Sequence, residues 1–324
     1  MAARKVPHEQ LQQAVDLVAQ YGSAHGASIV SGIPSGTIYS RCMMATREGI
    51  VAGAHPAPAP ALRPVPAALQ GVRRAGGRSH LIIPDVQAKP DVPNDHLEWI
   101  ANYAIVHRPD FIGQIGDWFD MPSLSSYDKG KRSYEGRRYV DDIDAGRASI
   151  ERFERTIEDY NRTHTEDPYD PEKRVFLGNH EHRADRAADV DPMLYGKVGV
   201  SDMGFEDYGW ITHPFLEVVT IDGVEYSHYF TSGDKGLPVS SAAALLALRQ
   251  GSATMGHVQR TDIAMHKKTQ RIGLFCGICY LHNETYLGPQ GNGTRRQIVM
   301  KREVADGKYD LEFVSLERLR KEYS

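Results

Sequence analysis

Short apolar runs and helical patterns alternate along the chain beyond about residue 78. Three runs are continuous enough to form buried strands, and the stretches between them repeat apolar residues at helical spacing. The predicted strands are residues 79–85, 110–117 and 174–179. The predicted helices are residues 94–108 and 142–160. Strands that alternate with helices predict an α/β sheet.

The same pattern assigns faces and further pairs of strands. The second predicted helix should turn Ile143, Ile150, Phe153 and Ile157 inward, and the first, "NDHLEWIANYAIVHR", has a capped start. The C-terminal third is richer in strand pairs, for example around Asp222-Gly223.

The chain before residue 78 has a different composition. Residues 51–70 are more than half Ala and Pro, which disfavours regular structure and is typical of an extended linker. The expected organisation is therefore an all-α domain over 1–50, a linker over 51–78 and an α/β domain over 79–324. Eight Lys/Arg against three Asp/Glu give residues 1–78 a charge of +5, although the whole chain carries −4. A small basic module is suited to a polyanionic partner.

Residues 8–48 contain three helical patterns: the second is short, at about residues 24–31, and a turn at Gly32 separates it from the third. One helix should bury Leu11, Ala14, Val15 and Val18, and the last should bury Ile38, Cys42 and Ala45. The stretch resembles the helix-turn-helix of bacterial and phage regulators, which implies DNA binding. The residues offered to a groove would be Ser35, Thr37, Tyr39, Ser40 and Arg41. The alternative is a three-helix bundle for oligomerisation or protein contacts.

The cysteine content and the N-terminal sequence indicate the cellular compartment that we expect for this protein. Three cysteines in 324 residues argue against a disulfide framework. Cys276 and Cys279 lie on an apolar strand where positions three apart face opposite ways, so both are expected in the core. The chain begins without an apolar signal region and has no run long enough to span a bilayer. The expected location is the cytoplasm of a bacterial or phage-infected cell, with no membrane partner.

Polar clusters follow most of the predicted strands. They hold carboxylate, amide or imidazole groups, and open α/β folds place ligand sites at strand ends. The clusters are "PDVQ" (Asp85, Gln87), "GDWFD" (Asp117, Asp120), "GNHEH" (Asn179, His180), "YSHYF" (His228) and "GHVQ" (His257, Gln259). One such cluster is usually a turn or a core histidine, but five in this order indicate a shared site.

The order of these clusters resembles the motifs D-x-H, G-D-x-x-D, G-N-H-[ED], a strand His and G-H-x-H of the calcineurin-like metallophosphoesterases. The likeness covers about residues 79–282. It implies a four-layer α/β/β/α sandwich with two divalent metal ions at the strand ends. It also implies hydrolysis of a phosphate ester by a metal-bound hydroxide.

The resemblance assigns metal ligands residue by residue. Asp117 would bridge the two ions, and Asp85 would hold the first. Asn179, His228 and His257 would hold the second.

It also assigns the group that acts on the substrate. His180 would be the general acid or a donor to the phosphoryl oxygens, and Asp120 would orient its ring. Glu181 and His182 receive no role beyond support of the turn.

The first metal position departs from the family pattern twice. Gln87 and Gln259 stand where the motifs have histidine. Because a Gln can coordinate through its carbonyl oxygen, the first ion would be held by oxygens alone: Asp85, Gln87, Asp117 and Gln259. Such a set suits Mg²⁺ or Mn²⁺ better than Zn²⁺ or iron. The alternative is an empty first position and a mononuclear or inactive protein.

A basic insertion follows "GDWFD". Met121 stands where phosphoprotein phosphatases of this superfamily have an arginine, which disfavours a phosphoprotein substrate. The stretch "SSYDKGKRSYEGRRYV" then interleaves tyrosines with Lys131, Arg132, Arg137 and Arg138. Charge for phosphates and rings for bases suit a nucleic-acid strand, although such a run is commonly a solvated loop.

Together these features predict a metal-dependent phosphodiesterase or nuclease that acts on DNA, of phage or prophage type. The alternatives are a phosphoesterase for small nucleotides or phosphoproteins, and a non-catalytic DNA-binding protein.

Overall fold

The structure is a computed structural model of the whole chain. It describes residues 6–21, 27, 30–50, 76–284 and 288–324, so most of the expected linker lies outside the described residues. The chain divides into two compact units, residues 1–63 and 64–324, and each is described by itself. Among the described helices, none combines the length and apolar character needed to cross a membrane.

The first unit contains the two helices that the apolar spacing predicts. They are α1, His8–Tyr21, and α3, Ser35–Arg47. A small core joins them, in which Ala14 and Ile38 are buried and Leu17, Val18, Ile33 and Cys42 pack alongside. Gly32 has φ +69°, the left-handed conformation that favours glycine, and it lies in the turn before α3. The helix expected between these two lies largely outside the described residues.

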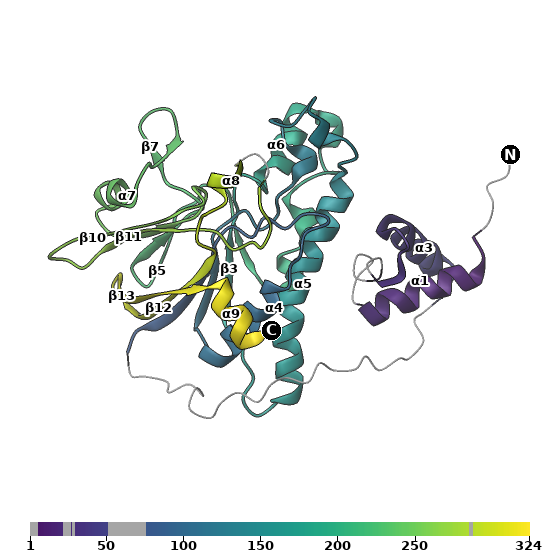
Figure 1. The fold of residues 1–324 in the computed structure, drawn as a ribbon, viewed down its shortest axis with the longest axis horizontal. Coiled ribbons are helices and arrows are strands. Elements are labelled where there is room, and N and C mark those ends of the chain that lie inside the picture. The colour runs from purple at the N-terminus through teal and green to yellow at the C-terminus, as the bar shows by residue number, and fades with distance from the viewer. Residues whose placement is uncertain (1–5, 22–26, 28–29, 51–75, 285–287) are drawn as a thin grey trace. The chain divides into compact units, whose positions relative to one another are not determined.

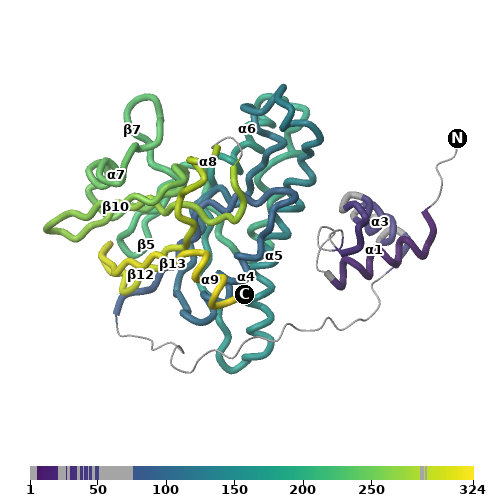
Figure 2. Tube along the Cα trace, viewed as in Figure 1, coloured from purple at the N-terminus to yellow at the C-terminus, as the bar shows by residue number. Residues whose placement is uncertain are grey.

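The second unit is built on a six-stranded sheet in the order β13-β12-β1-β2-β3-β4. The strands are β1 Arg78–Ile83, β2 Phe111–Gln114, β3 Glu172–Phe176, β4 Ile211–His213, β12 Gln297–Ala305 and β13 Lys308–Ser315. Strands β1 to β4 are parallel, whereas β12 runs antiparallel to both β1 and β13. Figure 2 shows β12 and β13 side by side before the C-terminal helix. All three strands predicted from apolar runs are confirmed.

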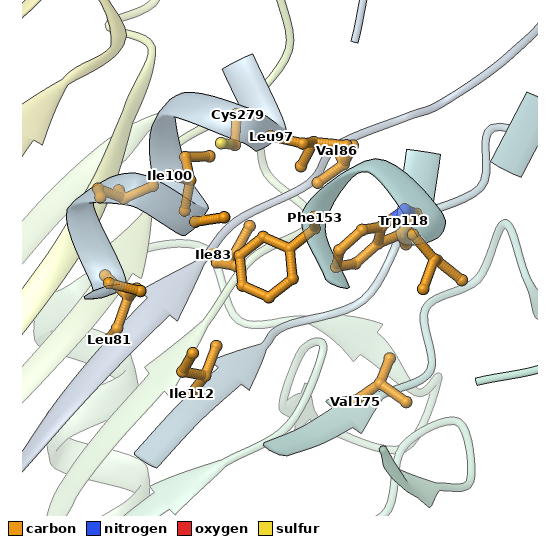
Figure 3. Packing of buried hydrophobic residues seen from close by; sticks show 14 of the residues in the cluster. Leu81, Ile83, Val86, Leu97, Ile100, Ile112, Trp118, Phe153, Val175 and Cys279 are labelled. Carbon is orange, nitrogen blue, oxygen red and sulfur yellow. The ribbon is translucent and has the colours of Figure 1, made fainter. Parts of the chain in front are cut away.

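Helices cover one face of this sheet. They are α4 His96–His107, α5 Tyr139–Thr163 and α9 Leu316–Tyr323. The four predicted inward positions of α5 are all buried in the largest cluster, together with residues of β1, β2 and β3. Figure 3 shows Phe153 of α5 beside Ile83 and Trp118. The expected cap of α4 is not formed: the Asp95 side chain caps no backbone N–H, and one of its oxygens lies 3.1 Å from Arg152 Nη1.

A second sheet packs on the other face. It has the order β10-β11-β9-β6-β5. Its strands are β5 Val219–Ile221, β6 Val224–Tyr226, β9 Ser252–Met255, β10 Thr261–Met265 and β11 Ile272–Cys276. The predicted pair around Asp222-Gly223 is the antiparallel hairpin of β5 and β6, and both turn residues have positive φ.

The clusters of buried residues define four layers. One cluster lies between the two sheets and includes Phe111, Tyr226 and Cys276. Another joins the outer face of the second sheet to helix α7, Ala242–Arg249. The order is therefore helices, sheet, sheet, helix, which confirms the predicted α/β/β/α sandwich (Figure 1). Cys276 and Cys279 are both buried, as predicted, but β11 ends at Cys276, so Cys279 lies beyond the strand and packs in a different cluster.

Short elements complete the second unit. They are η2 Pro122–Leu124, η3 Arg132–Tyr134, α6 His182–Val190, η4 Pro192–Leu194, η5 Val200–Met203, η6 Glu206–Tyr208, β7 Thr231–Ser232, β8 Leu237–Pro238 and α8 Gly288–Gly291. Helix α6 follows the loop after β3 and packs beside η2 and η5. It therefore lies next to the strand ends that carry the polar clusters.

Candidate metal centre

The polar clusters meet because their strands end at the same edge of the sandwich. Asp85 follows β1, Asp117 follows β2 and Asn179 follows β3, all in the parallel part of the first sheet. The backbone N–H groups of Val86 and Gln87 both donate to the Asp117 carbonyl, at 3.0 and 2.8 Å. The loop after β1 is thus hydrogen-bonded directly to the loop after β2.

Four polar side chains converge on one point. The ligand atoms of Asp117, His228 and His257 all lie within 4.8 Å of one another. Asn179 Oδ1 is 3.0 Å from His228 Nε2 and 2.7 Å from His257 Nδ1. His228 Nε2 is also 3.4 Å from Asp117 Oδ1. The structure therefore brings together all the residues predicted for the second metal position.

The protonation of His228 favours a cation at this point. Its Nδ1 is 2.8 Å from the Ile115 carbonyl oxygen, which only accepts, so Nδ1 carries the proton. Burial lowers the pKa of His228, although the Asp117 carboxylate opposes this, and the ring is neutral near pH 7. A neutral ring with a proton on Nδ1 turns a lone pair at Nε2 toward the oxygens of Asn179 and Asp117. Three acceptors that face one another fit a metal ion.

His257 is neutral for a similar reason. Burial, followed by the neighbouring His228, lowers its pKa to about 4. Its ring is therefore available as a ligand at neutral pH.

The first metal position contains buried polar atoms without partners. Asp85 Oδ1 accepts from the His257 N–H at 3.2 Å, but Asp85 Oδ2 and both polar atoms of the Gln87 side chain have no hydrogen-bond partner among the described residues. Burial, and next the charge of Asp117, raise the pKa of Asp85 well above its usual range. Two buried carboxylates that repel each other, beside an unpaired amide oxygen, fit an oxygen-liganded cation.

Gln259 is placed differently from Gln87. It is partly buried, and its Oε1 accepts a hydrogen bond of 3.4 Å from the Tyr280 hydroxyl. Gln87 and Gln259 both have positive φ, +46° and +53°, as do Asp117 and His257 at +53° and +65°. Four predicted ligands thus share a backbone conformation that costs energy in non-glycine residues, a cost that proteins commonly concentrate at functional sites.

His180 and Asp120 form the pair that the motifs predict. His180 Nδ1 lies 3.0 Å from Asp120 Oδ1, and His180 Nε2 lies 3.7 Å from Asp117 Oδ2. Burial lowers the pKa of His180, but the carboxylates of Asp117 and Asp120 outweigh it and the net pKa is raised. Burial raises the pKa of Asp120, but His180 and Lys89 outweigh it, so Asp120 stays ionised. An ionised Asp120 can orient the ring but cannot act as the proton donor.

Glu181 is a support that sequence analysis underestimated. Its fully buried carboxylate accepts from the backbone N–H groups of Asp117 (2.9 Å), Phe119 (2.8 Å) and Gly178 (2.8 Å). It therefore ties the loop after β2 to the loop after β3. Burial, and next the charge of Asp117, raise its pKa to about 7. A Cβ at Gly178 would collide with Asp117 Oδ1, which explains the glycine before Asn179.

Lys89 and Glu284 were not found by sequence analysis. Lys89 Nζ lies 2.9 Å from Asp120 Oδ2 and 2.5 Å from Glu284 Oε1. Glu284 Oε1 is in turn 2.7 Å from His282 Nε2. No local pattern links Lys89 to Glu284, because 195 residues separate them.

The basic insertion is partly engaged within itself. Arg137 donates to Asp128 Oδ2 at 2.7 Å and to the Pro122 carbonyl at 3.0 Å, and Lys131 pairs with Asp128 at 3.3 Å. Arg132 and Arg138 are exposed. Arg137 therefore stabilises the loop, whereas Arg132 and Arg138 are open to a ligand.

The predicted DNA-contacting residues of α3 fall into three groups. Ser40 is exposed and Thr37 is half-buried. Arg41 Nη2 donates to Gln10 Oε1 of α1 at 2.8 Å, so this guanidinium also joins the two helices. The side chains of Ser35 and Tyr39 lie outside the described residues.

The sequence matches no family model and no curated protein. Solved structures with some likeness include zinc-bound Vps29 of Entamoeba histolytica (11% identity, TM-score 0.31), YfcE, a phosphoesterase from E. coli (10%, 0.32), and TT1561 of Thermus thermophilus (11%, 0.30). Each match covers 74% of this chain and 99% of the other. Because scores of this size are too low to carry an argument, the fold and the site rest on the contacts above.

Proposed function

We propose that this chain is a metal-dependent phosphoesterase of the calcineurin-like type, and that it acts as a phosphodiesterase or nuclease on DNA. The observation that carries the proposal is the convergence of Asp117, Asn179, His228 and His257 beside the His180–Asp120 pair. A cation-binding cluster next to an oriented imidazole is the arrangement needed to hydrolyse a phosphate ester.

Two sets of residues would hold divalent ions. One set is Asp117, Asn179, His228 and His257, and the other is Asp85, Gln87 and Asp117, with Gln259 as a further oxygen. When bound, such ions polarise the phosphoryl group and supply a nucleophile near neutral pH. The oxygen-rich set favours Mn²⁺ or Mg²⁺.

The chain's own residues position the substrate. In this structure His180 Nε2 accepts from Arg183 Nη2 at 3.0 Å; once protonated, it would donate to a phosphoryl or leaving-group oxygen on the Asp117 side. Asp120 Oδ1, which lies 3.0 Å from His180 Nδ1, would orient that ring. Glu181 keeps the loops of Asp117 and Asn179 at a constant separation through its bonds to Asp117 and Gly178.

Two features support a nucleic acid rather than a small ester. The insertion exposes Lys131, Arg132, Arg138 and the ring of Tyr127, which is 81% exposed. Cations beside an aromatic ring are suited to a single strand. The basic N-terminal module would add contacts to the phosphate backbone.

The deciding experiment measures the metal content and the cleavage of single- and double-stranded DNA, bis(p-nitrophenyl) phosphate and small nucleotides with Mn²⁺. Cleavage of DNA supports the proposal, and cleavage of small nucleotides alone supports the small-substrate alternative. If DNA is bound but no ester is cleaved, the second unit is a scaffold for a DNA-binding protein.

Two variants separate the contributions of the loop and the N-terminal module. The double variant Lys131→Glu/Arg132→Glu should raise KM for DNA several-fold but not KM for the small diester, since it removes positioning contacts. Lys308→Glu, an exposed site on β13, is the matched control. Deletion of residues 1–50 should weaken retention on DNA and flatten its salt dependence, while hydrolysis of the small diester is unchanged.

A further inference from the structure

A largely buried arginine, Arg183, lies beside the predicted acid His180. Arg183 is the second residue of α6, His182–Val190, and its side chain is only 11% exposed. Its Nη1 donates to the carbonyl oxygens of Asp120 (2.7 Å) and Met121 (3.3 Å). These two bonds hold the guanidinium at the rim of the metal centre.

The other terminal nitrogen faces the reacting side of the site. Arg183 Nη2 donates to His180 Nε2 at 3.0 Å, and that ring nitrogen is 3.7 Å from Asp117 Oδ2. An oxygen atom bound next to His180 Nε2 is therefore also within reach of the guanidinium.

The charge of Arg183 is only weakly paired, through a long ion pair with Asp120. Asp120 Oδ1 is 3.9 Å from Nη1 and is closer to His180, while Asp120 Oδ2 pairs with Lys89. Among the described residues, the hydrogen bonds of Arg183 use Nη1 and one Nη2–H, and none is made by Nε–H. A planar guanidinium that keeps free donors beside an imidazole is suited to bind an oxyanion.

We infer that Arg183 binds a phosphoryl oxygen of the substrate together with His180. This inference rests on the proposed function, and it deepens that function by naming the residue that recognises the phosphoryl group. Met121, fully buried on the same loop, contributes only its carbonyl oxygen to this arrangement. Helix α6 thus supplies a cation that the loop after β2 does not.

The test measures binding of inorganic phosphate to the Mn²⁺-loaded protein by calorimetry, which requires no turnover. One charge-assisted hydrogen bond contributes a factor of about ten to a hundred in affinity, so Arg183→Met should raise the Kd of phosphate by about that factor. Arg183→Lys should fall between, because it keeps the charge but loses the planar fork. Arg186→Met, an exposed arginine on the same helix, is the matched control and should bind as wild type does.

An unchanged Kd in a folded Arg183→Met variant overturns the inference, because Arg183 then only anchors α6 to the Asp120 and Met121 carbonyls. If Arg183→Met does not fold, the Kd of phosphate is measured for Arg183→Lys instead, after a thermal melt has shown that this variant is as stable as wild type. An unchanged Kd in Arg183→Lys then overturns the inference. Failure of wild type to bind phosphate overturns the inference as well.

Hydrolysis of bis(p-nitrophenyl) phosphate by wild type tests the proposed function separately. Binding of phosphate that depends on Arg183, without hydrolysis of any ester, removes the proposed function and keeps the inference. Hydrolysis of the ester, combined with a Kd of phosphate that does not change in Arg183→Met, keeps the proposed function and removes the inference.

Discussion

Two regions of the sandwich bury ionisable groups in opposite ways. At the strand ends Asp85 and Asp117 are buried side by side, and Asp85 Oδ2 has no hydrogen-bond partner among the described residues. Between the sheets Lys301 is equally buried, but its Nζ lies 3.1 Å from Tyr226 Oη and 2.5 Å from Thr254 Oγ1. The first region leaves a carboxylate oxygen of Asp85 without a partner among the described residues, and the second satisfies its amine with neutral oxygens.

The difference shows how a buried charge distinguishes a ligand site from a structural core. Burial lowers the pKa of Lys301 to about 7, so the amine can become neutral at little cost near physiological pH. Asp85 beside Asp117 is best stabilised by a cation, because protonation would sacrifice an oxygen that faces the site. Unpartnered carboxylate oxygens therefore mark the metal centre, whereas the partnered amine marks a core.

The largest effect should follow from Asp117→Asn. The substitution keeps an oxygen that can accept from the backbone N–H of His180 but removes the charge shared by both metal positions. We expect kcat for the small diester to fall by about a thousandfold or more, beyond the tenfold to hundredfold typical of mutated groups around metal ligands. The measurement is turnover, with a thermal melt to confirm folding. Turnover equal to wild type would remove Asp117 from the metal site.

The Lys301 region should respond to pH rather than to metal. The pKa of Lys301 is about 7 in the folded chain and about 10.4 for unfolded lysine, so the unfolded state binds more protons between these values. Lys301 should therefore contribute a rise of about 2 kcal/mol in the free energy of unfolding between pH 7 and 9, measured as the difference between wild type and Lys301→Met. Lys301→Met should remove most of this rise, and Lys308→Met on the surface should retain it. Denaturant titrations of the metal-free chain measure both, and a slope kept in Lys301→Met contradicts the assignment.

The two glutamines of the first metal position should give a smaller and unequal effect. Gln87 has no hydrogen-bond partner for its side chain among the described residues, whereas Gln259 already accepts from Tyr280. We expect Gln87→Ala to weaken Mn²⁺ binding at this position about tenfold, by loss of a ligand or its support, and Gln259→Ala to weaken it less. Histidine at both positions should shift the preference toward Zn²⁺.

Metal counting decides this case. Two ions per wild-type chain and one in Gln87→Ala support the oxygen-liganded pair. One ion in both proteins, with activity kept, indicates a mononuclear centre.

Much of the fold could be predicted because its signals are local. The runs that became β1, β2 and β3 are continuous apolar segments, and the inward side of α5 follows from helical spacing. The boundaries were less certain: α5 begins at Tyr139 and ends at Thr163, a few residues beyond the pattern on each side. The predicted cap at the start of α4 was wrong, because the Asp95 side chain pairs with Arg152 of α5 instead.

The positions that could bind metal were also visible in the sequence, since each follows directly after a strand. The contacts among them were not. Lys89 and Glu284 are far apart in the sequence. Arg183 and His180 are only three residues apart, a common spacing. Neither pattern is distinctive, because charged residues at such spacings are usually solvent-exposed.

The sequence by itself determined which segments form strands and helices and which polar residues stand at strand ends, because periodicity and motif order are properties of neighbouring residues. Only the tertiary structure decided that Asn179 faces both His228 and His257, that Gln87 is left without a partner among the described residues while Gln259 has one, and that Arg183 reaches His180. These outcomes depend on how separate loops close over one another. Burial at that closure also sets the pKa of Asp85, His257 and Lys301, which no local pattern encodes.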